Sequence, residues 1–275
     1  MPESDYCGFV ERLAPAVRRA AQIARQLEGR VPNRPKLEET TPVKQALTTA
    51  DTAAQEALLG PLLEYFPQVR LLAEEDTPSV GRFPKKADAA VVIDPIDGTL
   101  LSYLEGGGPY AVMIGLVLDG CYEAGLVALP REGLLFQASR GAGALMARAG
   151  GSPRRVRPSA DGDCVLVSHG MPRSVIEYLT RRGLRVVSSC GGAVSVAPLI
   201  PGVRAGLRHA SGALGISIRG RIGALIAVEA GALVRGASGA GFPLDLDTPA
   251  STLEVAASPE DLTLLDDALA AAGLI

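Results

Sequence analysis

An apolar run that ends in two aspartates is the first feature of this sequence that suggests chemistry. The segment VVIDPIDGTLL occupies residues 91–101, and its β-branched opening is typical of a strand covered on both faces. Asp94 and Asp97 follow with no basic residue close by in the sequence, and the Gly-Thr pair after them can begin a helix. One interpretation is an aspartate-rich turn that caps a helix. The other is that the carboxylates share a divalent metal and the helix N-terminus holds a phosphate.

Acidic residues end apolar segments at three separate places. Asp51 follows LTTA, Glu74 and Glu75 follow LLA, and Asp94 and Asp97 follow VVI. Open α/β sheets place their sites at the carboxyl ends of strands, so these acids are expected to meet. Oxygen ligands without histidine or cysteine favour magnesium over zinc. Each segment alone is typical of a surface turn, but their joint order and spacing favour a shared metal site.

These segments resemble those of the magnesium-dependent, lithium-sensitive phosphatases related to inositol monophosphatase, a superfamily that includes bisphosphate nucleotidases and fructose bisphosphatases. The matching segments lie in family order along most of the chain: LTTAD (47–51), AEE (73–75), DPIDGT (94–99), RGAGA (140–144) and GALIAVEAG (223–231). DPIDGT with an upstream Glu-Glu pair is the specific signal. The resemblance implies an α/β fold, a layered αβαβα sandwich, and an enzyme that hydrolyses a small phosphorylated metabolite with a metal-activated water.

The resemblance also implies roles for the acidic residues. Glu74, Asp94 and the backbone carbonyl of Ile96 would bind a first Mg²⁺, and Asp97 would join Asp94 on a second. Glu75 would be an outer ligand, and Glu74 would belong to the catalytic set as well. Magnesium polarises phosphoryl oxygens and makes a bound water more acidic. Positioning and charge then carry most of the catalysis of phosphoryl transfer.

Two further roles follow from the same resemblance. Thr99, supported by Asp51, would orient and deprotonate the attacking water. Gly98 and Thr99 would offer backbone N–H groups to the phosphate at a helix N-terminus.

One departure from the family pattern concerns the second metal. The family usually has a Trp-Asp pair before the glycine-alanine helix, and Ile218 and Arg219 stand there in this sequence. Arg219 is a solvated arginine near a helix start in one interpretation. In another it reaches Asp94 and Asp97, and its guanidinium replaces the charge of the second metal, which leaves a one-metal or slower phosphatase. In a third the protein has lost catalysis and binds a phosphorylated ligand.

Three further residues are candidates for contact with the substrate: Gly192, which stands where a serine is common, Ala193 and Arg208. The region 203–221 is rich in arginine, which indicates either ordinary surface charge or an anion pocket for a second phosphate. The second interpretation would favour a 3′(2′),5′-bisphosphate nucleotidase or a sugar bisphosphatase. The segment VLVSHG (165–170) faintly resembles the nucleotidase branch, but its Ser-His pair more simply ends a strand.

The first half of the chain predicts helices and a sheet. Apolar residues at helical spacing cover 5–28, with Pro15 inside the run, and a polar, proline-containing loop covers 30–46. A second helix is expected from Thr48, with a kink or break at Pro61. Strands are expected over VRLLAEED and AAVVIDPID.

An antiparallel three-stranded meander over 110–138 completes the first half of the chain. The turn-rich segment 150–162 is the expected boundary between an α+β half (1–150), which carries the acidic motifs, and an α/β half (151–275), which completes the substrate pocket. In the second half, strands and helices are expected to alternate. After the boundary segment we expect strands at CVLVSHG and LRVVSS, helices at SVIEYLTRRG and GALIAVEAG, and a terminal helix at 259–272.

Composition limits the class of protein. The chain has 275 residues, 47% of them apolar, and a net charge of −3, which gives no sign of a partner that is a nucleic acid polymer. There is no signal-peptide pattern and no apolar run long enough for a membrane span. Four widely spaced cysteines indicate reduced thiols and a cytoplasmic location. With only two histidines, the chain is poorly supplied for a mechanism with a histidine base or for a histidine-rich zinc site. By analogy with relatives, a homodimer is expected.

Overall fold

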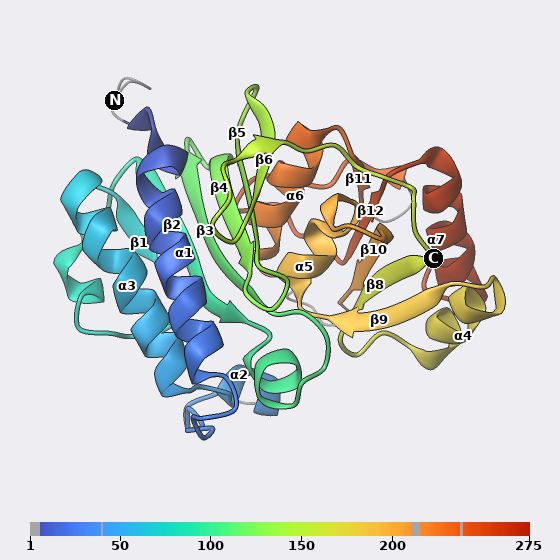
Figure 1. Cartoon of the computed structure of the whole chain (residues 1–275), viewed down its shortest axis with the longest axis horizontal. Coiled ribbons are helices and arrows are strands. Elements are labelled where there is room, and N and C mark those ends of the chain that lie inside the picture. The colour runs from blue at the N-terminus through green and yellow to red at the C-terminus, as the bar shows by residue number, and fades with distance from the viewer. Residues whose placement is uncertain (1–5, 40, 211–214, 237–238) are drawn as a thin grey trace.

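Helices and sheets alternate in five layers (Figure 1). The computed structural model describes residues 6–39, 41–210, 215–236 and 239–275. Two helices cover the outer face of a first sheet, two lie between that sheet and a second, and two cover the outer face of the second. In that order these are α1 (Phe9–Leu27) and α3 (Thr49–Tyr65), α5 (Gly191–Ser195) and α6 (Gly220–Ala230), and α4 (Arg173–Arg181) and α7 (Pro259–Ala271). The expected αβαβα sandwich is confirmed.

The first sheet has seven strands, which lie side by side in chain order. They are β1 (Arg70–Leu72), β2 (Ala89–Asp97), β3 (Ala111–Leu118), β4 (Cys121–Leu129), β5 (Leu134–Ser139), β6 (Gly143–Arg148) and β7 (Arg154–Arg155). β1 pairs with β2 in parallel and the later pairs are antiparallel. The expected meander is confirmed, and β6 and β7 extend it further. Asp119 and Gly120 have positive φ values (48° and 80°) in the turn between β3 and β4, as an Asp-Gly hairpin turn requires.

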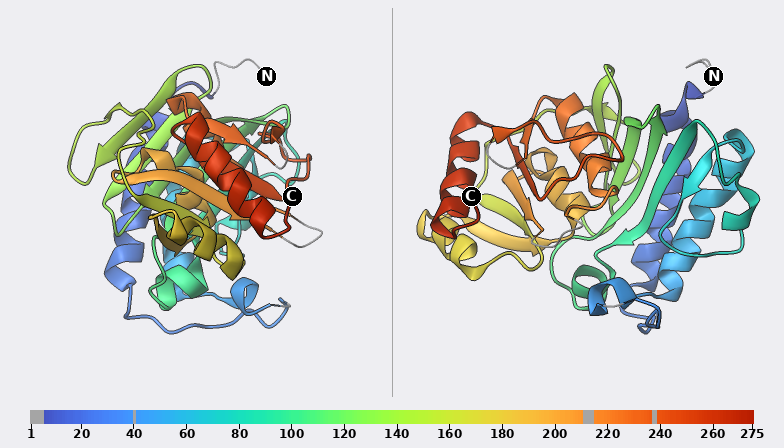
Figure 2. Two further views of the ribbon diagram at one scale, coloured as in Figure 1. Left: turned by 90° about the vertical axis from the view of Figure 1, so that its right-hand side faces the viewer. Right: turned by 180° about the vertical axis from the view of Figure 1, so that it is seen from behind.

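The second sheet is mixed. Its strands, in spatial order, are β11 (Leu233–Arg235), β12 (Thr252–Ala256), β10 (Val203–His209), β8 (Cys164–Ser168) and β9 (Arg185–Ser189). β10, β8 and β9 are parallel neighbours, while β12 runs antiparallel to β10 and to β11. Helix α7 lies across the outer face of this sheet (Figure 2). The alternation expected for the second half is therefore present.

The helices on the outer face of the first sheet both contain a proline. Pro15 lies inside α1 and Pro61 inside α3, yet both helices are continuous, so the expected break at Pro61 is wrong. A proline removes one backbone hydrogen bond, but most helix stability in proteins comes from packing of the apolar face. α3 buries three leucines around Pro61, and α1 buries a stripe of apolar side chains.

Two smaller features complete the description. The expected loop 30–46 contains a four-residue helix, α2 (Pro42–Gln45), whose N-cap Thr41 accepts from the Lys44 N–H group. None of the helices in the described ranges is both long and apolar enough to cross a membrane. All four cysteines are free.

Helix α6 packs closely on the first sheet although it belongs to the second half of the chain. A Cβ atom at Gly115 would lie 2.8 Å from Ile222 Cγ1, and one at Gly125 would lie 3.0 Å from Ile222 Cγ2. The two glycines therefore let α6 approach the strands. β7 lies within the expected boundary segment 150–162 and pairs with β6. The division into two halves at this segment stays a prediction.

Candidate active site

A bulge in β2 brings the two aspartates of DPIDGT to one face. Asp94 pairs with Met113 of β3 and Asp97 pairs with Ala111, so β2 holds one more residue than β3 between these two pairs. In a regular strand, residues three apart point to opposite faces, and the extra residue cancels that alternation. Pro95, which lies in the bulge, has no N–H group to donate to a ladder. The proline between the aspartates thus accounts for their shared face.

Thr99 is positioned by a glycine turn and a short π-helix. Gly98 has a φ of 89°, and a Cβ atom there would lie 2.7 Å from the Cβ of Cys190, so both the conformation and the space require glycine. The helix expected after it is present as the π-helix η3 (Thr99–Leu104), in which the Tyr103 N–H group donates to Gly98 O at 3.0 Å. Phosphate binding by the Gly98 and Thr99 amides stays a prediction.

Asp51 and Thr99 meet, as the sequence suggested. Asp51 lies in the first turn of α3, and its Oδ2 accepts from the backbone N–H and the hydroxyl of Thr48, both at 2.7 Å. The Thr99 hydroxyl lies 2.9 Å from Asp51 Oδ1 and 2.8 Å from Ile96 O. Burial raises the pKa of Asp51, and the hydrogen bonds from Thr48 and Thr99 oppose that shift. Because the hydroxyl has one proton, it donates to only one of its two acceptors at a time.

Asp94 lies at the centre of the acidic group. It is only 5% exposed, and its Oδ1 has no hydrogen-bond partner among the described residues. Burial raises the pKa of Asp94 well above its usual range, the charges of Glu74 and Asp97 raise it further, and Arg219 opposes them. Asp97 Oδ2 accepts the backbone N–H of Gly192 at 2.5 Å. A buried carboxylate oxygen without a donor is costly, which indicates that a cation or a proton belongs there.

Arg219 enters this group from the N-terminus of α6. Its Nε donates to Ile93 O at 3.1 Å, its Nη2 donates to Ala73 O at 3.4 Å, and its Nε lies 3.9 Å from Glu74 Oε2. The expected partners, Asp94 and Asp97, are therefore wrong: the two carbonyls hold the guanidinium beside Glu74 instead. Its charge still lowers the pKa of Asp94. The interpretation of a purely solvated arginine is also wrong, since the side chain is only 24% exposed and donates hydrogen bonds to two backbone carbonyls.

The donors expected for a first and a second metal differ in their partners. No group of three or more His, Cys, Asp and Glu side chains in the described part of the chain is arranged to hold a metal. The set expected for a first metal needs only two carboxylates, Glu74 and Asp94, with the carbonyl of Ile96. The partnerless oxygen of Asp94 is consistent with that set. Asp97, expected on a second metal, already accepts from Gly192, and Arg219 supplies a fixed positive charge nearby.

Glu75 faces a different partner. Its Oε1 forms an ion pair with Lys36 Nζ at 2.9 Å, and its backbone groups are bonded to the Gln55 amide. The residue is 5% exposed, and burial raises the pKa of Glu75, which the charges of Glu74 and Asp51 raise further. The lysine ties the loop before α2 to the acidic group. Glu75 is thus close to the site, although its carboxylate is turned towards a lysine.

The sequence interpretation missed one neighbour of these acids, His169. The VLVSHG segment does end a strand, β8, as expected, but His169 Nε2 lies 2.8 Å from Ser102 Oγ. When the Ser102 hydroxyl donates to Gly107 O, which lies 2.9 Å away, the histidine Nε2 must carry the proton of their contact. Burial lowers the pKa of His169, whereas the charges of Asp97 and Glu105 raise it. Only the tertiary fold places this side chain beside η3.

Gly192 is a glycine for a steric reason. A Cβ atom at Gly192 would lie 2.5 Å from Met113 Sδ and 2.9 Å from Ala111 Cβ, so a serine cannot fit without moving β3. Its neighbour Ala193 is buried, and its N–H group lies 3.4 Å from Cys190 Sγ. Ala193 therefore has no exposed side chain to offer a substrate, whereas the Gly192 backbone N–H contacts Asp97 directly.

Arg208 fills a slot between two helix starts. A Cβ atom at Gly191 or at Gly220 would overlap its guanidinium. Gly191 precedes the residue that binds Asp97, and Gly220 follows Arg219, so the slot lies next to the acidic group. The Arg208 side chain makes no hydrogen bond or ion pair with the described residues. A half-buried guanidinium without an acidic partner is a candidate contact for an anion.

Comparison with known proteins agrees with this geometry. The family model of the inositol monophosphatase family matches residues 10–194. A histidinol-phosphatase of Chlorobaculum parvum is 36% identical over 121 residues, which are 44% of this chain and 44% of that protein. A fructose-1,6-bisphosphatase/inositol-1-monophosphatase of Thermotoga maritima is 32% identical over 116 residues, 42% of this chain and 41% of that protein. The chain thus matches less than half the length of these curated relatives.

Solved structures resemble nearly the whole chain. A Thermotoga maritima IMPase has a TM-score of 0.71 at 19% identity and covers 93% of this chain and 96% of its own. The extragenic suppressor protein suhB of Bartonella henselae has a TM-score of 0.73 at 20% identity and covers 95% and 98%. At such identities the likeness concerns the fold. Because the family model spans more than half of the sequence, the chain belongs to the inositol monophosphatase family.

Proposed function

We propose that this protein is a Mg²⁺-dependent phosphatase of the cytoplasm that hydrolyses a small soluble phosphate monoester with a metal-activated water. The observation that carries the proposal is the Thr99 hydroxyl, which lies within hydrogen-bond distance of both Asp51 and Ile96 O. Asp94, two residues before Ile96, has a carboxylate oxygen without a partner among the described residues. A hydroxyl placed between a buried base and a cation-binding carbonyl can orient a water. Membership of a family whose relatives are named as phosphatases supports the same class.

Each residue of the site has a separate role in this proposal. Glu74, Asp94 and the Ile96 carbonyl would hold Mg²⁺, which when bound makes a water more acidic and polarises phosphoryl oxygens. With Ile96 O engaged in this way, the Thr99 hydroxyl donates to Asp51 Oδ1. Its oxygen would accept a hydrogen bond from the attacking water, and as the water loses that proton the Thr99 proton would pass to Asp51 Oδ1. Arg219 lowers the electrostatic cost of gathering Glu74 and Asp94 in a buried place.

A substrate with two anionic groups is the second candidate. The Arg208 side chain has no acidic partner, and it lies against Gly191 and Gly220. The residues next to these glycines, Gly192 and Arg219, contact the acidic group. A second phosphate, as in a nucleotide or sugar bisphosphate, would supply the missing anion. Arg208 would not stabilise the binding of a substrate whose leaving group carries a positive charge. The name of the Thermotoga maritima relative includes a bisphosphatase, which agrees with this preference.

The test is phosphate release from a panel of esters, with and without Mg²⁺. The panel contains inositol 1-phosphate, histidinol phosphate, adenosine 3′,5′-bisphosphate and fructose 1,6-bisphosphate. We expect release that requires Mg²⁺ and is lost in Asp94→Asn, whereas Asp119→Asn, in the turn between β3 and β4, serves as the control that retains it. Activity that survives in Asp94→Asn would contradict the proposed site.

A catalytically degenerate family member is the alternative. Arg219 in place of the usual aspartate is the observation that favours it. Such a protein would release no phosphate from any ester of the panel. One of the same esters would nevertheless raise its melting temperature, and Asp94→Asn would change that rise.

A further inference from the structure

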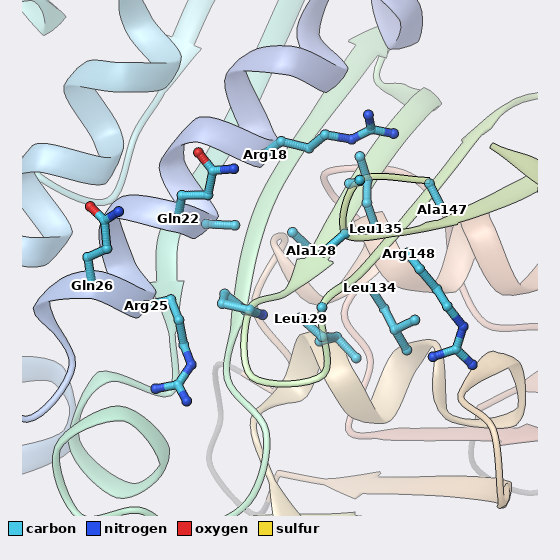
Figure 3. A pocket seen from close by; sticks show the side chains of 15 residues that line it. Arg18, Gln22, Arg25, Gln26, Ala128, Leu129, Leu134, Leu135, Ala147 and Arg148 are labelled. Carbon is cyan, nitrogen blue, oxygen red and sulfur yellow. The ribbon is translucent and has the colours of Figure 1, made fainter. Parts of the chain in front are cut away.

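One cavity in the described part of the chain lies away from the acidic site. It is a groove of about 350 Å³ between α1 and the ends of β4, β5 and β6 (Figure 3). It opens on the face of the first sheet that α1 covers, whereas α5 and α6 lie on the opposite face. No residue that lines it belongs to the candidate active site. Cavities of this size are in the range that binds small organic molecules.

One wall of the groove is polar and its floor is apolar. α1 contributes side chains at helical spacing along one stripe: Arg18, Ala21, Gln22, Arg25 and Gln26. On the face that α1 covers, the strands contribute Ala128, Leu135 and Ala147, whose side chains are almost fully buried. Leu129 and Leu134 also line the groove, but their side chains pack in the core on the α6 side of the sheet. Figure 3 shows Arg18 extending from α1 over the strands. The floor can accept an apolar body, and the wall can hydrogen-bond its substituents.

The charges that line the groove have one sign. Arg18, Arg25 and Arg148 line it, and no aspartate or glutamate does. Arg25 is paired with Glu28 at 2.9 Å. Arg18 and Arg148 form no hydrogen bond or ion pair through their side chains with the described residues. Two unpartnered guanidinium groups beside an apolar floor leave the groove without the negative charge that would complement it.

We propose that this groove binds a small organic anion, with its apolar body on the leucine and alanine floor and its phosphate, carboxylate or sulfonate held by the arginines. The shape, the apolar floor and the uniform charge together select this class over a neutral or cationic ligand. The site does not depend on the phosphatase activity, because it shares no residue with the acidic group.

The probe for the test is 8-anilinonaphthalene-1-sulfonate, an aromatic anion whose fluorescence reports apolar binding. Titrations in a buffer without Mg²⁺ and without phosphate avoid a second anion that would compete for the groove. We expect the double variant Arg18→Ala/Arg148→Ala to lose about tenfold or more in affinity, since charge-assisted contacts to the anion disappear. The control Arg173→Ala/Arg181→Ala removes two exposed arginines of α4 and should bind as the wild type does.

Two further measurements test separately whether charge, groove shape or oligomeric state determines dye binding. The uncharged dye N-phenyl-1-naphthylamine should bind weakly and equally to the wild type and to the arginine double variant. Ala21→Phe should fill the groove and also lose the anionic dye. Equal affinity of the anionic dye for the wild type and both double variants would overturn the proposal. A second result would also overturn the proposal: sedimentation shows that Ala21→Phe changes a dimer to a monomer, and the dye binds only to the monomer. The groove would then be a contact between two copies of the chain.

Discussion

At the scale of single residues, the site depends on which charges are fixed in the chain. Arg219 is held by two backbone carbonyls and approaches Glu74, so its guanidinium stays beside the acids with or without a bound ion. A fixed cation stabilises ionised carboxylates, and it also competes with a metal for the same negative charge. We therefore expect the same residue to help to assemble the acidic group and to limit how many ions the group binds.

Replacing Arg219 tests that competition. Arg219→Gln should raise the affinity for Mg²⁺ about tenfold, because one nearby positive charge at intermediate dielectric contributes on the order of 1–2 kcal/mol. Arg219→Lys keeps the charge and should leave the affinity close to that of the wild type. Isothermal titration calorimetry without substrate measures both, and circular dichroism checks the fold. An unchanged affinity in Arg219→Gln would contradict the competition.

The Thr99 hydroxyl is testable with a similar pair of variants. Thr99→Val keeps the shape of the side chain but cannot bond Asp51, so kcat/KM for the phosphate ester should fall about 100-fold or more. Thr99→Ser keeps the hydroxyl and should retain activity within about tenfold. Steady-state phosphate release measures both. If Thr99→Val is as active as Thr99→Ser, the hydroxyl does not handle the proton of the water.

The sequence was informative about residues that end regular elements and uninformative about those that reach across the fold. The family resemblance implied the Asp51–Thr99 pair, and the DPID spacing suggested that Asp94 and Asp97 act together, whereas the bulge that gives them one face is seen only in the structure. The partners of Arg219 could not be inferred because they are the backbone carbonyls of Ile93 in β2 and of Ala73 just after β1, both more than 100 residues away. The place of His169 depends in the same way on how β8 packs against η3.

At the scale of elements, the π-helix that begins with Thr99 is clamped from outside. Arg131 donates to Gly108 O at 2.5 Å and to Ser102 O at 2.8 Å, and its Nε pairs with Glu28 Oε1 at 2.6 Å. Its guanidinium also lies over the ring of Tyr110. π-Helices are rare and less stable than α-helices. The arginine therefore compensates for weak internal bonding of η3 by binding both its last turn and the loop that follows.

Loss of that clamp should loosen η3 and leave the sheet intact. Arg131→Lys keeps a positive charge but cannot bond two carbonyls and a carboxylate at once. We expect faster hydrogen exchange at the amides of residues 99–108 and a several-fold lower kcat with a smaller change in KM. The control Arg140→Lys changes another arginine that bonds a carboxylate and a carbonyl, Glu123 and Tyr122 O. Equal exchange in both variants would show that Arg131 does not hold η3.

Elements with strong apolar patterns were predicted, and those formed by pairing were not. The helices, β2 and the meander have apolar runs or helical spacing that fix their type. β7 is a two-residue strand that exists because β6 offers a free edge. The π-helix has no separate sequence pattern, since its extra residue per turn is an outcome of the Gly98 conformation and of packing. Pro61 was misleading because buried leucines on both sides of it hold α3 together.

At the scale of the whole molecule, a buried acid couples stability to pH. Glu254 of β12 is fully buried, its Oε2 accepts from Arg235 Nε at 2.5 Å, and its Oε1 has no partner among the described residues. Burial raises the pKa of Glu254 to about 7 from an ordinary 4.5, although Arg235 opposes the shift. Between these two values the folded state holds more protons than the unfolded chain. The free energy of unfolding therefore falls as pH rises through this window, and Glu254 adds no further change above it.

Glu254→Gln should remove that dependence. The difference in unfolding free energy between the wild type and the variant should shrink by roughly 2–3 kcal/mol from pH 5 to pH 8, because each pKa unit corresponds to about 1.4 kcal/mol. Urea unfolding at several pH values measures it. Asp161→Asn, at an exposed position, is the control and should follow the wild type at every pH. A constant difference between the wild type and Glu254→Gln would show that Glu254 is ionised throughout.

The close fit of Ile222 over Gly115 and Gly125 has a consequence for a chain that has been cut. The inner face of the first sheet is covered by a helix that the second half supplies, so neither piece alone could hide its apolar surface from water. A protease cut between β7 and β8 should leave the two fragments bound to each other. They should elute as one particle in native buffer and migrate as two bands after denaturation. Early separation of the fragments would mean that the peptide bond, and not α6, joins them.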